Sequence, residues 1–207
     1  MEVLFASNNH HKKTELSEIL KPHTVLIPSD IGVAFDFNES GSTYLENALG
    51  KAFALFRQIK GTPKEMPVVS DDSGLSIPAL KGDPGVYSSR YGSKEAGRRL
   101  SDAERNRYLL HKLAGVTDRR GFFVCSMVLV FHEYRFFAAQ ETLDGEIAYQ
   151  PAGSGGFGYD PLLFLNEYGK TVAELLPAEK NRISHRGKAG IRIRDILDRE
   201  ERLKQRR

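Results

Sequence analysis

Residues Val68 to Gly92 read VVSDDSGLSIPALKGDPGVYSSRYG, and two adjacent carboxylates, Asp71 and Asp72, stand near the start of this stretch. The apolar run Val68–Ser70 predicts a short buried strand that ends at the acids, and Ser73–Gly74 predicts a turn directly after them. Because successive side chains of a strand point to opposite faces, one carboxylate would enter a cleft and the other would face the scaffold. Mg²⁺, a hard cation with oxygen ligands, would suit the inward one. An Asx turn, in which the Asp side chains bond the local backbone, is the structural alternative.

Length and composition set broad limits on the class of protein. The 207 residues have ordinary apolar content, enough for one sizeable core in a single domain or in one domain with two lobes. The chain has no run of eighteen apolar residues, and its N-terminus MEVLFASNNHHK lacks the pattern of a secretory signal. The lone Cys125 fits a reducing compartment, so we expect a cytoplasmic protein. No basic neighbour flanks this cysteine, which we interpret as a small core residue rather than a nucleophile.

The net charge of +3 comes from the last segment of the chain. Residues Ile191–Arg207 hold seven Lys or Arg and four Asp or Glu, which leaves 23 basic and 23 acidic residues in the rest. A basic terminal helix could touch nucleic acid. A solvated helix face with charge pairs four residues apart explains the same pattern, and we expect no nucleic-acid partner.

The first sixty residues predict strands that alternate with helices. Val3–Ala6 and Val25–Ile27 are short apolar runs, and apolar residues within Leu16–Leu20 recur with helical spacing. A long helix is expected over Thr43–Lys60, because Thr43 and Glu46 form a capping box ahead of an apolar stripe.

The second half predicts further elements of both types. Ser101–Gly115 begins with another capping box, and Gly121–His132 and Arg135–Leu143 predict two long strands joined by a hairpin. Leu162–Leu165 predicts a short strand, and a final helix is expected from about Ser184. The mixture favours a single α/β domain, residues 1–207, with a mixed sheet.

A polar loop, Ser7–Lys12, lies where the first strand feeds the first helix. Free backbone N–H groups at a helix start, with the Lys12 ammonium, would hold phosphate. An ordinary N-capped helix is the alternative reading of the same Ser and Asn residues. His10 and His11 are adjacent, so they lack the spacing of metal ligands.

Two later segments also carry candidate binding residues. Gly153–Pro161 reads GSGGFGYDP, where glycines would let the backbone approach a ligand and an aromatic ring would stack on a base; a plain glycine-rich turn is the alternative. Ala178–Lys188 reads AEKNRISHRGK, with Ser184 as the expected N-cap. Cations at a helix N-terminus oppose the helix dipole, so this segment indicates an anion or an acceptor-rich ligand.

Taken in order, SNNHHK, GSTYLENALGKA, SDDSGL with GDPGVYSSRY, GSGGFGYDPLLF and AEKNRISHRGKA resemble the inosine triphosphate pyrophosphatase family over almost the whole chain. The resemblance implies an elongated mixed sheet flanked by helices, in two lobes with the active cleft between them, and a homodimer. It further implies Mg²⁺-dependent hydrolysis of ITP, dITP and XTP to the nucleoside monophosphate and pyrophosphate.

The resemblance also implies residue roles. Asp72 matches the general base and Lys12 the catalytic lysine on the triphosphate, while Asp72 and Glu39 would carry the metal ion. The loop Phe157–Asp160 would stack on the base, and Lys180, His185 and Arg186 would reach the nucleobase. The residues implied in substrate binding are Ser7, Asn8, Asn9, His10, His11, Lys12, Ser73, Phe157, Gly158, Tyr159, Asp160, Lys180, His185 and Arg186.

One position departs from the family pattern, and other functions stay open. Asn8 stands where family loops commonly have Gly; Asn tolerates positive φ better than most residues, so we expect binding to survive there. Related pyrophosphatases that act on pyrimidine or methylated nucleotides are the main alternative. A nucleotide- or RNA-binding module without catalysis is a second, and a metal-independent phosphatase a third.

Overall fold

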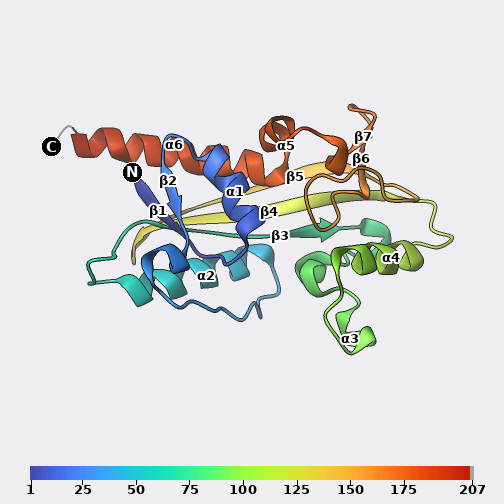
Figure 1. The fold of residues 1–207 in the computed structure, drawn as a ribbon, viewed down its shortest axis with the longest axis horizontal. Helices are drawn as coiled ribbons and strands as arrows, with labels where there is room; N and C mark the ends of the chain where they lie inside the picture. Colours follow the sequence, from blue (N-terminus) through green and yellow to red (C-terminus); the bar gives the residue numbers. More distant parts are fainter. Residues whose placement is uncertain (206–207) are drawn as a thin grey trace. The chain divides into compact units, whose positions relative to one another are not determined.

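The computed structural model describes residues 1–205, and its strands form one seven-stranded sheet (Figure 1). In sheet order the strands are β2 (Thr24–Leu26), β1 (Glu2–Phe5), β3 (Val68–Ser76), β4 (Arg120–His132), β5 (Arg135–Ile147), β6 (Leu163–Leu165) and β7 (Lys170–Thr171). Strand β1 runs parallel to β2 and β3, whereas β6 is antiparallel to both β5 and β7. The sheet is therefore mixed, as the sequence predicted.

The helices are α1 (His10–Ile19), α2 (Tyr44–Ile59), α3 (Ser93–Ala96), α4 (Asp102–Lys112), α5 (Pro177–Ile183) and α6 (His185–Gln205). Both predicted capping boxes form, at Thr43–Glu46 ahead of α2 and at Ser101–Glu104 ahead of α4. None of the helices within residues 1–205 has the length and apolar content needed to cross a membrane.

The chain divides into two compact units. Unit 1 comprises Met1–Asp72, Cys125–Glu141 and the C-terminal segment from His185; unit 2 comprises Ser73–Val124 and Thr142–Ser184. Strands β3, β4 and β5 each contribute residues to both units. That the whole chain acts as one two-lobed domain stays a prediction.

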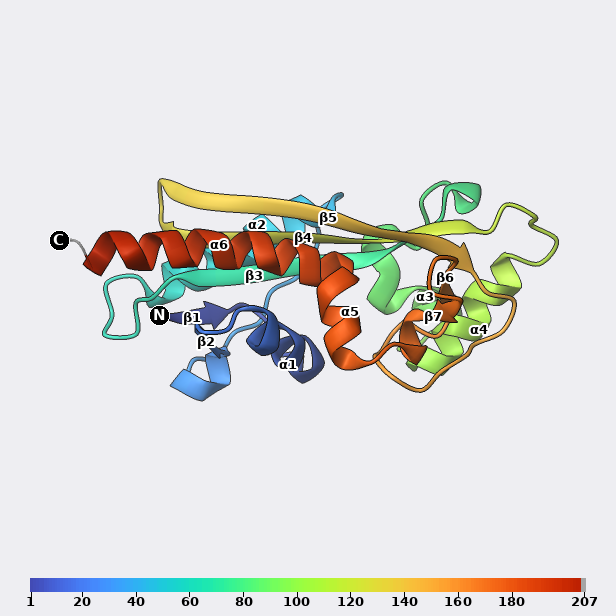
Figure 2. The ribbon, with the colours of Figure 1, turned by 90° about the horizontal axis from the view of Figure 1, so that it is seen from above.

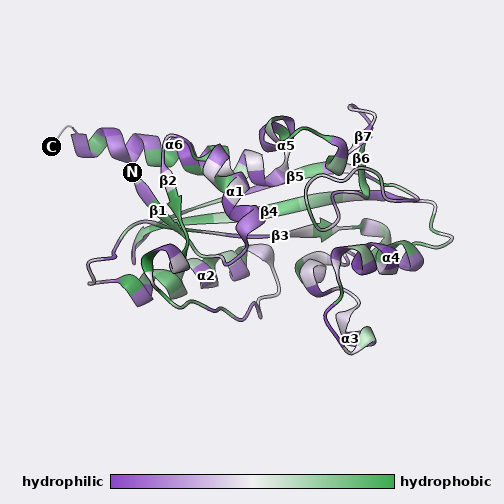
Figure 3. Cartoon of the chain, in the orientation of Figure 1, coloured by the Kyte–Doolittle hydropathy of each residue, from purple (hydrophilic) through white to green (hydrophobic). Residues whose placement is uncertain are grey.

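Unit 1 buries apolar side chains on both faces of its strands. On one face Phe5, Val69 and Met127 pack with residues of α1 and α6. On the other face Leu4 and Val68 pack with the apolar stripe of α2. In Figures 1 and 2, α6 and α2 accordingly lie on opposite sides of β4. Figure 3 shows mainly polar colours on α6, whose few buried apolar residues, such as Ile193, face this core.

Unit 2 has its own core. The buried Leu75, Leu109, Tyr159 and Leu163 belong to it, so strand β3, helix α4, the glycine-rich loop and strand β6 all contribute. Arg119 is also buried here, because its guanidinium donates to three backbone carbonyls, those of Ile147, Leu113 and Ala148. The lower right of Figure 1 shows α3 and α4, the green helices of this unit.

Two elements differ from the sequence prediction. Strand β3 does not end at the acids but continues through Asp71 and Asp72 to Ser76. The predicted turn at Ser73–Gly74 is wrong, because tertiary packing outweighs the local preference: a Cβ on Gly74 would lie 2.4 Å from Ser88 Oγ and 2.6 Å from the Gly85 carbonyl oxygen. Gly74 is thus required for close approach of another segment rather than for a turn.

Candidate active site

The two acids of β3 point to opposite faces of the strand, as the alternation of side chains predicted. Asp71 shares its face with Val69, which packs with α1 and α6. Asp72 shares its face with Val68 and with Ser70, whose hydroxyl donates to the Ala48 carbonyl of α2 at 2.6 Å. Both carboxylates are buried, at 1% and 5% exposure, so each needs partners from the helix on its own side.

Asp71 is the centre of a buried ion-pair network. Lys12 Nζ donates to Asp71 Oδ1 at 2.9 Å, and Arg186 Nε donates to Asp71 Oδ2 at 3.1 Å. Arg186 Nη1 also donates to Glu15 Oε2 at 2.6 Å. Burial would raise the pKa of Asp71, but the positive charges of Lys12 and Arg186 outweigh it and hold this pKa below its usual value. Asp71 is therefore a permanent anion that ties α1 to α6.

This network revises the expectation for Arg186. The resemblance implied that Arg186 reaches the nucleobase, but the side chain is 3% exposed and its guanidinium pairs with Asp71 and Glu15. A guanidinium so enclosed holds the scaffold together in this structure. His185, its neighbour, is also buried, at 5% exposure, and a contact between His185 and substrate stays a prediction.

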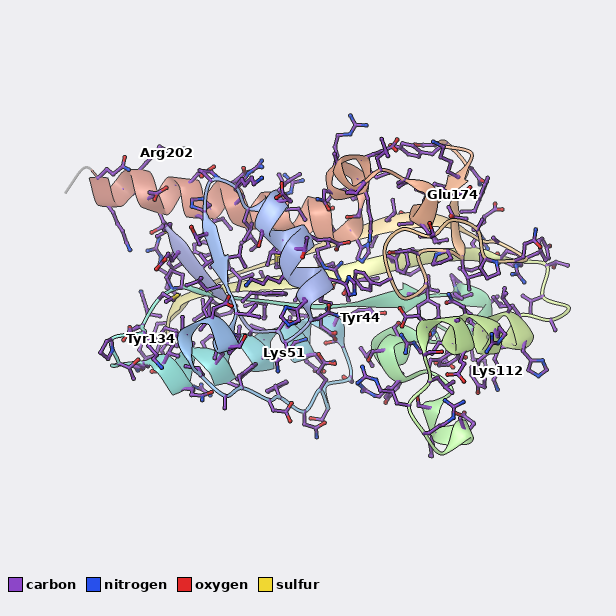
Figure 4. The ribbon with its side chains drawn as sticks, viewed as in Figure 1. Tyr44, Lys51, Lys112, Tyr134, Glu174 and Arg202 are labelled. Carbon is purple, nitrogen blue, oxygen red and sulfur yellow. The ribbon has the colours of Figure 1, made fainter. Side chains whose placement is uncertain are left out.

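Asp72 has a different environment, supplied by α2. Asn47 Nδ2 donates to Asp72 Oδ2 at 2.9 Å, and Lys51 Nζ lies 4.0 Å from Asp72 Oδ1. Asn47 also accepts from the Gly41 backbone N–H at 2.8 Å, which fixes the loop that carries Glu39. Lys51 Nζ in turn forms an ion pair with Glu39. Asp72, Lys51 and Glu39 thus form a chain of alternating charge; Figure 4 labels Lys51 on α2.

The pKa of Asp72 shifts in the opposite direction from the pKa of Asp71. Burial raises the pKa of Asp72; Lys51 opposes this shift and the Glu39 carboxylate adds to it. Burial would lower the pKa of Lys51, but Asp71, Asp72 and Glu39 together raise it, so Lys51 stays charged. A carboxylate with a raised pKa, held beside a fixed cation, is suited to accept a proton.

Sequence reasoning missed Asn47 and Lys51. Both are buried, at 1% and 7% exposure, and they lie one helical turn apart next to the apolar stripe of α2. Two polar residues at positions i and i+4 beside buried alanines were the available signal. Glu46, a second acid near the loop that carries Glu39, is engaged in its capping role, because its carboxylate accepts from the backbone N–H groups of Ser42 and Thr43.

The loop after β1 is shorter than the predicted Ser7–Lys12, because helix α1 already begins at His10. Asn9 is the N-cap and accepts from the Lys12 backbone N–H at 3.1 Å. The Asn8 side chain donates to the Phe35 carbonyl at 2.9 Å. Asn8 does not adopt positive φ; within residues 1–205 only Lys81, among residues other than glycine, does. His10 and His11 are exposed in the first turn of α1.

The glycine-rich loop of unit 2 is organised around Asp160. Asp160 Oδ2 accepts from the Phe157 backbone N–H at 2.8 Å and from Lys180 Nζ at 2.8 Å. The Lys180 ammonium also lies 4.9 Å from the centroid of the Phe157 ring. Gly156 adopts a φ of +70°, where a Cβ would lie 2.0 Å from Asp160 Oδ2. The predicted residues Phe157, Asp160 and Lys180 therefore do come together.

Tyr159, in the same loop, points into the core of unit 2. The ring is 4% exposed, belongs to the core of unit 2, and donates its hydroxyl to the Ser88 carbonyl at 3.0 Å. We therefore correct the expectation that Tyr159 stacks on a base, because a ring buried in this way has no free face. Phe157, which is partly exposed, remains the candidate.

The oxygen ligands available for a metal ion are few. Within residues 1–205, no three His, Cys, Asp or Glu side chains converge into a complete protein site. Asp72 and Glu39, which both approach Lys51, are nevertheless hard oxygen donors of like charge. Mg²⁺ usually binds through one or two carboxylates plus phosphates and water, so this donor set fits it.

Cys125 is buried beside Asp71, with Sγ 4.0 Å from Asp71 Oδ2. Burial, together with the charge of Asp71, raises the pKa of the thiol to about 12. The thiolate is thus strongly disfavoured, and the interpretation of Cys125 as a small core residue is confirmed.

Sequence comparison identifies relatives over nearly the full length. The model of the Ham1 family matches residues 3–196. A dITP/XTP pyrophosphatase of Treponema denticola is 48% identical over 91% of this chain and 94% of the relative. The enzyme of the same name from Nitrosomonas europaea is 43% identical over 97% of this chain and 96% of its own.

Solved structures agree with these relatives. The structure of the Staphylococcus aureus Ham1 protein superposes with a TM-score of 0.83 at 36% identity, covering 97% of this chain and all of that one. A HAM1 protein from Coxiella burnetii gives the same TM-score at 37% identity, covering 96% of this chain and 99% of that one. With the family model, the identities and the fold in agreement, this chain belongs to the Ham1 family.

Proposed function

We propose that this protein is a nucleoside triphosphate pyrophosphatase that hydrolyses ITP, dITP and XTP to the monophosphate and pyrophosphate. The relatives named dITP/XTP pyrophosphatase support the substrate class. The observation that carries the chemistry is the placement of Asp72, whose carboxylate accepts from Asn47 Nδ2 at 2.9 Å and lies 4.0 Å from Lys51 Nζ, the ammonium that also pairs with Glu39. Burial raises the pKa of Asp72, whereas Lys12 and Arg186 lower the pKa of the adjacent Asp71. One acid is thus prepared to take a proton while its neighbour stays ionised.

In the proposed reaction, Asp72 orients a water molecule and accepts its proton. The water oxygen forms a bond to the α-phosphorus, and the bond from that phosphorus to the bridging oxygen breaks, so pyrophosphate leaves. Asn47 holds Asp72 Oδ2, which fixes the direction of the carboxylate. Lys51 keeps a positive charge near the base, and Lys12 is proposed to contact the triphosphate. Positioning and charge carry most of the rate in such a transfer.

We infer that Mg²⁺ is the cofactor and that Asp72 and Glu39 hold it. Mg²⁺ would offset phosphate charge and lower the pKa of bound water. Lys51 lies by both carboxylates, so it limits their mutual repulsion before a cation arrives. The remaining ligands would be phosphate oxygens and water, as Mg²⁺ prefers.

We propose that discrimination among bases depends on hydrogen-bond donors directed at the 6-keto oxygen of hypoxanthine or xanthine. Adenine presents a 6-amino donor at that position and would leave two donors facing each other. His185 is the proposed donor, since Arg186 is committed to Asp71 and Glu15. Phe157 would stack on the base, and Lys180 holds its ring and Asp160 together.

Substrate profiling tests this function. Purified protein with Mg²⁺ is incubated separately with ITP, dITP, XTP, ATP, GTP and UTP, and the products are identified by chromatography. We expect monophosphate and pyrophosphate from the first three and little turnover of ATP or GTP. Preference for UTP would indicate a pyrimidine-directed pyrophosphatase, and release of inorganic phosphate instead of pyrophosphate would refute attack at the α-phosphorus. Addition of EDTA should abolish turnover, and Mg²⁺ should restore it.

We further propose a cytoplasmic homodimer, as the resemblance implies. Light scattering after size-exclusion chromatography measures the mass directly. A mass near twice 23.2 kDa supports the dimer, and a mass near 23.2 kDa contradicts it.

A further inference from the structure

Side chains of helix α4 form hydrogen bonds with both the backbone N–H and the backbone carbonyl of Gly158 in the glycine-rich loop. The Gly158 N–H donates to Asp102 Oδ2, and Asn106 Nδ2 donates to the Gly158 carbonyl at 3.1 Å. Gly158 adopts a φ of +61°, a left-handed conformation that glycine tolerates without strain. Asp102 and Asn106 lie four residues apart, so they occupy one face of the helix. The helix thus fixes the peptide groups that directly follow Phe157.

Asp102 is itself held in place. Its other oxygen, Oδ1, forms an ion pair with Arg105 Nη2, and Arg105 Nη1 donates to the Leu100 carbonyl at 2.7 Å. Arg105 is 8% exposed, so the guanidinium that pairs with Asp102 is packed at the start of α4. The arrangement leaves Asp102 Oδ2 directed at the Gly158 N–H.

The buried Asn106 side chain has only one of its two polar atoms in a hydrogen bond within residues 1–205. The side chain is 4% exposed, and within residues 1–205 its Oδ1 has no hydrogen-bond partner. A buried acceptor without a partner is unfavourable, and a leucine at this position would avoid that penalty. The bond from Nδ2 to Gly158 is therefore the visible reason for an amide at this position.

The neighbours of Gly158 in the loop have contacts of their own. Phe157 is held through Asp160 and Lys180, and Tyr159 through its hydroxyl on the Ser88 carbonyl. Gly158 lies between these anchors. Its torsion angles set the direction of the Phe157 ring relative to the buried Tyr159, so a change at α4 would turn the candidate stacking ring.

We propose that Asp102 and Asn106 are positioning residues for base recognition: by fixing Gly158 they orient Phe157 and set the affinity for the purine, without taking part in phosphate chemistry. The inference rests on the proposed function. It assigns a role to helix α4, which none of the sequence motifs had marked as part of the site.

The test separates base binding from phosphate binding. Asn106→Ala, Asp102→Ala and the control Arg107→Ala, an exposed residue of the same helix, are compared with the unchanged protein. The measurements are kcat and KM for ITP, and the inhibition constant of inorganic tripolyphosphate, which has no base. Loss of one hydrogen bond should raise the KM for ITP about three- to thirty-fold in the first two variants. The kcat should change less than about two-fold, and inhibition by tripolyphosphate should be unchanged.

Two variants guard against a purely structural effect. Asn106 is buried, so Asn106→Ala could lower Tm, whereas Asp102 is 49% exposed and its replacement should leave the fold intact. Asp102→Asn keeps an oxygen for the Gly158 N–H and should retain a KM nearer the unchanged protein than Asp102→Ala. If Asp102→Asn and Asp102→Ala raise the KM equally, the bond to Gly158 is not the cause and the proposal is overturned.

Other outcomes are equally decisive. Weaker inhibition by tripolyphosphate in step with the KM, or variants that match Arg107→Ala, would also overturn the proposal. Binding of IMP, followed by calorimetry, needs no turnover and should weaken in the same two alanine variants. If the unchanged protein hydrolyses ITP but these variants bind IMP normally, this inference fails alone. If the unchanged protein neither hydrolyses ITP nor binds IMP, the proposed function fails and the inference with it.

Discussion

The carboxylate cluster of unit 1 and the glycine-rich loop of unit 2 are built by different physics. In the cluster, side chains from α1, α2, β3 and α6 neutralise one another as buried ion pairs. In the loop, most bonds end on backbone groups, those of Phe157 and Gly158, and one buried ion pair supports them. The first arrangement fixes charge, and the second fixes shape. Chemistry on phosphate needs the former, and recognition of a flat base needs the latter.

A second contrast lies within the carboxylate cluster, between the adjacent residues Asp71 and Asp72. Asp71 accepts from two cations, Lys12 and Arg186, whereas Asp72 accepts from the Asn47 amide at 2.9 Å and lies 4.0 Å from Lys51 Nζ. Their pKa values accordingly move in opposite directions. Identical side chains in one strand thus acquire opposite pKa shifts from the helix that each one faces, and only Asp72 is proposed to act as the base.

The strongest test of this division is Asp72→Asn. The variant keeps the bulk and removes the proton acceptor, so we expect kcat for ITP to fall by about 10²- to 10⁴-fold. Because burial disfavours the charge of Asp72, Tm should not fall. Steady-state kinetics and a thermal melt on the same preparation measure both. A kcat within about three-fold of the unchanged protein would contradict the role of Asp72 as base.

Asp71→Asn, by contrast, should mainly lower the stability of the fold. It removes the buried carboxylate that pairs with both Lys12 and Arg186, while Arg186 keeps its ion pair with Glu15. Loss of one partner of a buried ion pair typically lowers the free energy of unfolding by about 3–5 kcal/mol. Denaturant unfolding at neutral pH measures the loss. A stability equal to that of the unchanged protein would show that Asp71 contributes nothing as an anchor.

The same variant provides a pH test. The folded-state pKa of Asp71 lies below the ordinary value of 3.8, so its contribution to stability is present above that value and disappears as the pH falls through the folded-state pKa. The difference in unfolding free energy between Asp71→Asn and the unchanged protein should therefore be constant near pH 6–7 and shrink below about pH 4. A difference that grows on acidification would contradict the lowered pKa.

In the loop, Gly156→Ala should damage binding through shape alone. Its Cβ would lie 2.0 Å from Asp160 Oδ2 and 3.1 Å from Lys180 Nζ, so the ion pair under Phe157 must shift. We expect the KM for ITP to rise about ten-fold or more, with a smaller effect on kcat. Gly169→Ala is the matched control, since Gly169 has a φ of +61° and no atom within 4 Å of an added Cβ. Equal effects of both would assign the change to backbone strain rather than to the pair.

The smallest effect is expected from Cys125→Ala. The thiol is buried with a raised pKa, so activity should stay within about two-fold, and the free energy of unfolding should fall by only about 1 kcal/mol. Alkylating reagents should also leave the unchanged, folded protein active. Rapid inactivation of the unchanged protein, but not of the variant, would show that the cysteine is reachable.

Local signals predicted the elements that begin with a clear cap or an apolar period. The capping boxes at Thr43 and Ser101 and the strands around Val3 and Val25 lie close to their predicted bounds. Helix α5 was not recognised, because its seven residues carry charges and little apolar period. The length of β3 also depended on packing from segments distant in the sequence, which no local pattern records.

The sequence predicted several residues of the candidate site that do lie close together, but it did not predict the partner of each one. Phe157, Asp160 and Lys180 were named and do meet, and Asp72 and Glu39 do approach the same lysine. That lysine, Lys51, was not named, because a single polar residue on a helix resembles a solvated one until its burial is known. The same uncertainty made Arg186 appear available when it is enclosed. Motifs indicate which residues matter, but only packing decides which partner each one takes.

The discontinuity of unit 1 has a consequence for synthesis on the ribosome. Arg186 lies 115 residues beyond Asp71, and α6 supplies Ala189, Ile193 and Leu197 to the same core. All the segments of unit 2 leave the ribosome before α6 does. Until α6 has been synthesised, the N-terminal strands lack these apolar partners, and Asp71 lacks the guanidinium of Arg186. The core of unit 1 therefore cannot be completed before α6 is made, and we expect chains that terminate before this helix to be targets for chaperones and proteases.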